Sequence, residues 1–163
     1  MNTEQTLLST WDTQNSELEQ VDFTYDEHIM LKGVALTEFE FEASTRLRHA
    51  EETGQPEFGI QLQYAAHEKI QIQFSQHHGS WKLAVTSEGI TPVINRTLAL
   101  PANFEAEQWH TLHIAQQAHH LQLSLDGAYV LAISEPARVA QPGLVTHNAA
   151  ADFMNVKQIE LHA

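Results

Sequence analysis

A run of alternating leucines followed directly by an Asp-Gly pair is the feature that most constrains how this chain can fold. Leu121, Leu123 and Leu125 alternate with polar residues, and successive side chains of a strand point to opposite faces, so the run predicts a half-buried β-strand. Asp126-Gly127 follows at once, and this pair tolerates the positive φ angles of a tight hairpin turn. Apolar residues alternate again before and after this unit. The region therefore predicts a meander of three antiparallel strands.

The same period of two recurs along most of the chain. In 58–64 and 70–74, apolar residues alternate mainly with glutamines, which predicts a second hairpin. Other short alternating runs bring the expected number of strands to about ten to thirteen, with no long helix, and this rhythm is typical of an all-β sandwich. Two sheets of such a sandwich bury their apolar faces against each other about 10 Å apart. The residues at the inward positions form the expected core: Phe39, Phe41, Phe58, Ile60, Leu62, Ile70, Ile72, Phe74, Leu83, Val85, Leu112, Ile114, Leu121, Leu123, Leu125, Phe153 and Val156.

Length and composition set further bounds. A chain of 163 residues predicts a single domain spanning 1–163. The chain has no cysteine, which excludes disulfides and thiolate metal sites. No apolar run approaches the ~20 residues of a membrane span, and the N-terminus lacks the features of a secretory signal. The chain as given is expected in the cytoplasm, or outside the cell if it is a piece of a longer secreted protein.

The charge balance argues against two classes of partner. The formal net charge is −13, from 21 acidic and 8 basic residues. A nucleic-acid-binding protein needs a basic surface for the phosphates, and an anionic membrane surface attracts basic segments in the same way. Neither nucleic acid nor membrane is therefore an expected partner.

Two segments carry a resemblance to a known family. Trp109-His110-Thr111-Leu112, a polar turn, alternating leucines and an Asp-Gly turn form the first; Gly143, small residues and an Asp-Phe-x-Asn-Val ending at Val156 form the second. Together they resemble the concanavalin A-like jelly rolls, including the laminin-G-like and lectin-like domains attached to bacterial glycoside hydrolases. The resemblance implies an all-β jelly-roll β-sandwich of two antiparallel sheets. These are packing motifs, so they indicate a fold more strongly than a function.

What the resemblance implies for function is an accessory, non-catalytic domain of a glycoside hydrolase-like protein. Such a domain binds a neutral glycan weakly or packs against an adjacent catalytic domain. Glutamine amides both donate and accept hydrogen bonds, which suits sugar hydroxyls, although a solvated sheet face explains the same residues. The glutamines expected on one sheet surface are Gln61, Gln63, Gln71, Gln73 and Gln122, with Glu40, Glu42 and Lys82 nearby.

A small jelly-roll glycoside hydrolase is the rival interpretation. Glu38, Glu40 and Glu42 alternate along one predicted strand, and a pair of carboxylates can supply the acid and the nucleophile of glycoside hydrolysis. Laminarinase-type jelly-roll hydrolases also carry their carboxylates on one strand, but with a central Asp that is absent here. If the protein is an enzyme, Glu40 and Glu42 are the expected catalytic pair. A ligand-free structural or oligomerising sandwich is the third interpretation.

Metal binding has weaker support in the sequence. The chain has 11 histidines, but a zinc site needs three or four convergent ligands. On a regular strand, His110 and His113 point to opposite faces, and His110 shares its face with apolar residues, which predicts a partly buried, hydrogen-bonded histidine. We therefore expect no cofactor. A structural Ca²⁺ remains an alternative, for which the candidate oxygen ligands are Asp22, Asp26, Asp152 and Asn155.

Overall fold

The computed structural model describes residues 11–12, 17–20, 27–50 and 54–161, and all regular structure in them is β-strand. The strands are β1 (Trp11–Asp12), β2 (Glu17–Gln20), β3 (Glu27–Leu31), β4 (Phe39–Ala50), β5 (Glu57–Ala65), β6 (Glu68–His77), β7 (Ser80–Glu88), β8 (Asn95–Ala99), β9 (His110–Gln117), β10 (His120–Leu125), β11 (Ala128–Ser134), β12 (Gln141–His147) and β13 (Ala149–Glu160). Among these residues there is no helix long and apolar enough to cross a membrane.

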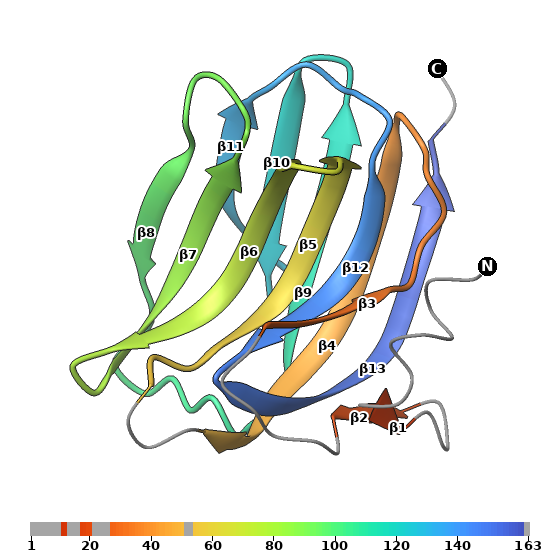
Figure 1. Cartoon of the computed structure of the whole chain (residues 1–163). Coiled ribbons are helices and arrows are strands. Elements are labelled where there is room, and N and C mark those ends of the chain that lie inside the picture. Colours follow the sequence, from red (N-terminus) through yellow and green to blue (C-terminus); the bar gives the residue numbers. More distant parts are fainter. Residues whose placement is uncertain (1–10, 13–16, 21–26, 51–53, 162–163) are drawn as a thin grey trace.

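The strands form two antiparallel sheets that pack face to face, with the six-stranded sheet in front in Figure 1. The seven-stranded sheet has the order β1-β2-β13-β4-β9-β10-β11, and the six-stranded sheet has the order β3-β12-β5-β6-β7-β8. The chain crosses between the sheets from β2 to β3, β3 to β4, β4 to β5, β8 to β9, β11 to β12 and β12 to β13. As a result, the last two strands lie inside the two sheets beside strands from early in the chain. The predicted two-sheet β-sandwich is confirmed.

The predicted meander is confirmed as β9, β10 and β11. Asp126 has φ 50° and Gly127 has φ 84°, and Leu125 pairs with Ala128 across them. Two central residues with positive φ are the signature of a type I′ turn, whose twist matches that of the flanking strands. The turn between β6 and β7 repeats this geometry at His78-Gly79, with φ angles of 51° and 80°.

The core lies between the two sheets where the alternation placed it. All of the expected core residues are buried except Leu125 and Val156, which are partly buried and pack against the core. Leu125 lies at the end of its strand beside the turn. Val156 follows Asn155, whose φ of 53° belongs to a bulge between Met154 and Lys157. Odd and even positions along a strand face opposite sides of the sheet, and we call this the parity of a residue. Parity is therefore a reliable guide to burial here, except where a turn or bulge interrupts the strand.

Candidate functional site

Four of the five predicted glutamines lie together on the outer face of the six-stranded sheet. Gln61 and Gln63 belong to β5, Gln71 and Gln73 belong to β6, and Gln61 is the cross-strand partner of Gln71. Their neighbours along each strand point toward the core, and all of them are buried except Tyr64, which is half-buried. The hairpin therefore brings the four side chains to one surface, as the alternation predicted.

The four side chains are joined head to tail by hydrogen bonds. Gln73 Nε2 donates to Gln71 Oε1 at 3.1 Å, and Gln71 Nε2 donates to Gln61 Oε1 at 2.8 Å. Gln61 Nε2 donates to Gln63 Oε1 at 3.0 Å, and Gln63 Nε2 donates in turn to the carbonyl oxygen of Ala65. We refer to Gln61, Gln63, Gln71 and Gln73 as the glutamine relay.

The carbonyl of Ala65 fixes the direction of the relay. A carbonyl oxygen can only accept, so Gln63 has to present its NH₂ group to it, and each preceding amide is then oriented the same way. At the far end, Gln73 Oε1 is buried and has no hydrogen-bond partner among the described residues. This atom, the open acceptor, is complementary to a hydrogen-bond donor, because a buried acceptor without a partner is costly.

Burial divides the relay into two covered and two accessible members. Gln61 is 0% exposed and Gln73 is 4% exposed, although both face outward from the sandwich. Gln63 and Gln71 are half-buried. Gln63 and Gln71 therefore offer the accessible polar edges of the face, and Gln61 and Gln73 orient them from below.

Gly59 sets the spacing of the two strands that carry the relay. It pairs with Gln73, and a Cβ added at this glycine would lie 2.1 Å from the backbone oxygen of Ile72 and 2.8 Å from the Cα of Gln73. Both atoms belong to the backbone, so they cannot move aside without shifting β6. A side chain at this position would therefore push apart the strands on which the relay depends.

A second polar group continues the same face beyond the open acceptor. Gln55 Nε2 donates to Ser75 Oγ at 3.0 Å and lies 3.1 Å from His77 Nε2. Lys82 pairs with Ser75 across β6 and β7, so the expected place of Lys82 near the glutamines is confirmed. Gln55 itself comes from the loop before β5, and no pattern in the sequence linked it to this face.

The fifth glutamine and the two glutamates lie on the other sheet. Gln122 belongs to β10 and Glu40 to β4, and Ala115 of β9 pairs with both. The prediction that Gln122, Glu40 and Glu42 lie beside the four glutamines is therefore wrong. Strand parity had correctly placed them on an outer face, but it carries no information on which sheet a strand joins.

On the outer face of the seven-stranded sheet, Glu40 contacts a histidine and Glu42 forms an ion pair with a lysine. Glu40 Oε1 lies 2.9 Å from His113 Nε2, and Glu42 Oε2 lies 3.3 Å from Lys157 Nζ. With Ile159 these four residues line a shallow depression of about 180 Å³. We refer to Glu40, Glu42, His113 and Lys157 as the ion-pair face. Glu38, the third residue of the alternating run, accepts a hydrogen bond from the backbone N–H of Ala118 at 2.8 Å.

His110 has the partly buried, hydrogen-bonded environment that its position in the alternation predicted. Its side chain is 12% exposed, with Nδ1 2.9 Å from Asp126 Oδ2 and Nε2 2.8 Å from the carbonyl oxygen of Glu105. Phe104 stacks on the ring at a centroid distance of 4.4 Å. His113 points to the opposite face, as expected.

The described residues contain no group of three or more histidine, aspartate or glutamate side chains that could hold a metal ion. Of the candidate Ca²⁺ ligands, Asp22 and Asp26 lie outside the described residues. Asp152 is 2% exposed, with Oδ2 2.9 Å from Arg46 Nε, and Asn155 is exposed. A structural Ca²⁺ therefore stays a prediction.

A charged cluster at one end of the sandwich has no signal in the sequence. The guanidinium of Arg138 lies 4.6 Å from the ring centroid of Tyr64 and pairs with Glu68 at 3.3 Å and Glu135 at 3.7 Å. The Tyr64 hydroxyl donates to Gln116 Oε1 at 2.8 Å. Burial, aided by the charge of Glu135 and opposed by that of Arg138, raises the pKa of Tyr64 well above its ordinary value. The members come from separate strands and loops, which only the fold brings together.

Solved structures with this fold are numerous and distant in sequence. A functionally unknown protein from Saccharomyces cerevisiae aligns with a TM-score of 0.75 at 11% identity, covering 94% of this chain and 92% of that one. The carbohydrate-binding module CBM66 of Bacillus subtilis aligns with a TM-score of 0.66 at 16% identity, covering 93% and 91%. The GH43 protein BlXynB of Bacillus licheniformis aligns with a TM-score of 0.66 at 15% identity, covering 94% of this chain and 35% of that one.

These likenesses establish a jelly-roll β-sandwich of two antiparallel sheets, the fold that the two sequence motifs predicted. In sequence, no protein-family model and no curated protein matches the chain. Against the GH43 protein, the chain spans about a third of its length.

Proposed function

We propose that this protein is a non-catalytic, glycan-binding accessory domain and that the glycan lies on the glutamine relay. The observation that carries the proposal is the open acceptor at Gln73. It lies at the end of a relay whose direction is fixed, and a hydroxyl group of a sugar is the kind of donor that it lacks.

The chemistry of the face suits a neutral, hydroxyl-rich ligand. The half-buried amides of Gln63 and Gln71 can each donate to one hydroxyl and accept from another. Hydrogen-bonded amides polarise one another, so a donor that reaches the Gln73 end strengthens the bonds along the relay. Because Gln73 Oε1 is covered, Gln71 is expected to make the direct contact, and a water or a small shift of side chains connects the ligand to the open acceptor.

Two of the structural likenesses support this class of function. One is a protein named as a carbohydrate-binding module, and another is a GH43 protein of which this chain matches 35%. A domain that corresponds to a third of a longer protein fits an accessory role beside another domain. The proposed partners are therefore a neutral glycan and an adjacent catalytic domain.

The hydrolase alternative depends on Glu40 and Glu42. Glycoside hydrolysis needs one carboxyl group that donates a proton and a second that attacks or activates water. Each of these carboxylates already faces a basic partner, His113 or Lys157. We therefore place the glycan on the relay and keep the hydrolase as the alternative that the experiment below also tests.

The test is a titration of the protein with a panel of neutral oligosaccharides, followed by NMR. We expect a millimolar dissociation constant, about 4 kcal/mol, because each amide–hydroxyl bond contributes only about 0.5–1.5 kcal/mol net. Gln71→Ala should weaken binding about two- to tenfold for the same reason. Gln122→Ala is the matched control, since it removes a half-buried glutamine from the outer face of the other sheet, and it should leave binding unchanged.

Three other outcomes decide between the alternatives. If no sugar shifts any resonance, the domain is structural. If Gln122→Ala and Gln71→Ala weaken binding equally, the relay is not the site. If oligosaccharide turnover occurs and Glu40→Gln or Glu42→Gln abolishes it, the protein is a hydrolase.

A further inference from the structure

One side of the sandwich is open between its two sheets. Strand β8 is the edge of the six-stranded sheet and β11 is the edge of the seven-stranded sheet. Residues from β8, from the loop after it and from the β10–β11 hairpin line a pocket of about 460 Å³ at this side, which we call the side pocket. This volume lies within the range of about 300–1,000 Å³ that is usual for small-molecule sites.

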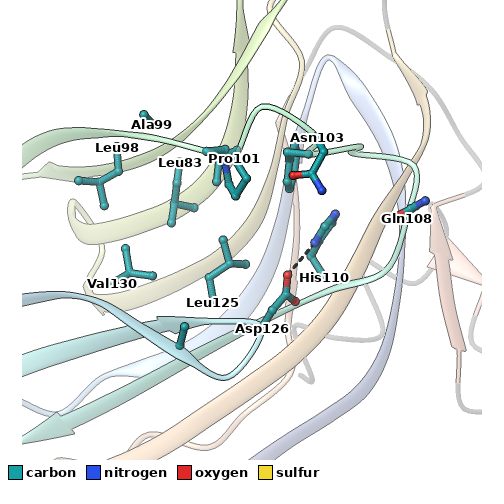
Figure 2. A pocket seen from close by; sticks show the side chains of 13 residues that line it. Leu83, Leu98, Ala99, Pro101, Asn103, Gln108, His110, Leu125, Asp126 and Val130 are labelled. Carbon is teal, nitrogen blue, oxygen red and sulfur yellow. Dashed lines mark hydrogen bonds and ion pairs between the residues drawn. The ribbon is translucent and has the colours of Figure 1, made fainter.

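The walls of the side pocket are apolar and come from both sheets. Leu83 and Leu98 line it from the six-stranded sheet, and Leu125 and Val130 line it from the β10–β11 hairpin, as Figure 2 shows. Leu83 is buried, whereas the other three are only partly buried although they point toward the interior. Apolar surface that the protein leaves open to water in this way is stabilised by an apolar ligand.

The opposite end of the pocket is polar and held in place. Asp126 accepts a hydrogen bond from the backbone N–H of Thr111 at 2.7 Å through Oδ1, and its Oδ2 lies 2.9 Å from His110 Nδ1 (Figure 2). A carboxylate has about four acceptor positions, and the side chain is 49% exposed, so positions remain open to a ligand. Asn103 and Gln108 lie on the same side.

We propose that the side pocket binds a small amphipathic molecule whose apolar body lies between the leucines and whose alcohol or amine group donates to Asp126. The head group has to be a donor because the carboxylate only accepts. It has to be neutral or cationic because the carboxylate and the net charge of −13 repel an anion. This site is separate from the glutamine relay, which lies on the outer face of the six-stranded sheet.

The experiment uses simple probes that separate the two halves of the ligand. In an NMR titration with 1-butanol, 1-hexanol and 1-octanol, each added methylene should raise the affinity about fourfold, the effect of burying one such group. Hexylamine should bind at least as tightly as 1-hexanol, and hexanoate about tenfold or more weakly, because of the carboxylate at the polar end. The shifted resonances should be those of Leu98, Leu125 and Val130.

Substitutions in the walls of the side pocket test where the probe binds, and a control substitution tests whether binding is lost through misfolding. Val130→Phe fills the pocket from the β10–β11 wall, and Leu98→Trp fills it from the opposite wall, so each should abolish binding. Val139→Phe, at a residue that is 55% exposed and does not line the pocket, should leave binding unchanged. Asp126→Asn keeps a residue that tolerates the turn's positive φ, and it should remove the preference of the pocket for hexylamine over 1-hexanol because the charge-assisted hydrogen bond is lost.

Two results would overturn the proposal. The first is an affinity that does not depend on chain length, because it means that no apolar body is buried. The second is binding that survives both blocking variants, because it places the probe elsewhere on the protein.

Discussion

The outer face of the six-stranded sheet carries amides that hydrogen-bond to one another, whereas the outer face of the seven-stranded sheet carries carboxylates beside basic side chains. Both faces are polar, and both are built on neighbouring antiparallel strands. They differ in burial, because Gln61 is 0% exposed, whereas the side chains of Glu40 and Lys157 are 36% and 61% exposed.

This difference has a physical origin. A neutral amide can be buried when its partners are in place, whereas a charge has to stay near water or lose its hydration at a high cost. The hydrogen bonds of the relay therefore depend on every one of its glutamines being present, and the strength of the ion pairs depends on the salt concentration. The comparison also explains why a neutral glycan suits the relay and not the ion-pair face.

The largest expected effect on stability is that of a substitution in the core that lies between the two sheets. Leu123 is 3% exposed, and Leu123→Ala should lower the free energy of unfolding by about 2–5 kcal/mol, through lost burial and the cavity left behind. Urea unfolding measures it. Ser124→Ala is the neighbouring control on the outer side of the same strand and should change stability by less than about 0.5 kcal/mol. Equal effects at both positions would contradict the assignment of inner and outer faces.

The next largest effect on stability is expected from substitutions of Gln61 and Gln73, the two covered members of the relay, and the two should differ. Gln61→Leu removes the hydrogen bonds that Gln61 makes with Gln71 Nε2 and Gln63 Oε1, so it should cost about 1–3 kcal/mol of stability. Gln73→Leu should cost less, because it also removes the open acceptor. The readout is again urea unfolding, with Gln122→Leu on the other sheet as the control. An equal loss for Gln73→Leu would show that its Oε1 has a partner in solution.

The ion-pair face should contribute less to stability than the relay. A double-mutant cycle with Glu42→Gln and Lys157→Met should give a coupling energy of about 0.2–1 kcal/mol at low salt, as for other exposed pairs. The coupling should largely disappear at about 1 M salt, where the screening length is about 3 Å. A coupling energy that persists at high salt would show that this face is drier than its exposure indicates.

The smallest expected effect is that of salt on glycan affinity. Neither the relay nor a neutral sugar carries charge, so affinity should change by less than about twofold between ~0.1 and ~1 M salt. Calorimetric or NMR titrations at the two concentrations measure it. A steep salt dependence would instead point to contacts with charged residues such as those of the ion-pair face.

Much of the fold could be predicted because its signals are local. The alternation of Leu121, Leu123 and Leu125 and the Asp126-Gly127 turn each depend on neighbouring residues, and the structure confirms both. The four glutamines of one hairpin could be grouped for the same reason. Their strands are close in sequence, so the pairing of β5 with β6 follows from the turn between them.

The remaining features of the fold and of the candidate site depend on contacts between segments that are distant in the sequence. Parity placed Gln122 on an outer face, but only the pairing of β10 with β9, and of β9 with β4, decides which sheet it joins. The burial of Gln61 and Gln73 on an outward-facing surface follows from a relay that no local pattern reveals. The same holds for the cluster around Arg138, whose members come from separate strands and loops.

The most direct test of the central claim is to map where a neutral oligosaccharide binds. The protein would be titrated with the sugar that binds most tightly, and the backbone amides and glutamine side-chain amides followed by NMR. Our account predicts that the largest shifts are those of Gln63 and Gln71, with smaller ones at Gln61 and Gln73 and none at Glu40 or His113. Shifts confined to the loops around His77 or His147, or centred on the ion-pair face, would contradict it.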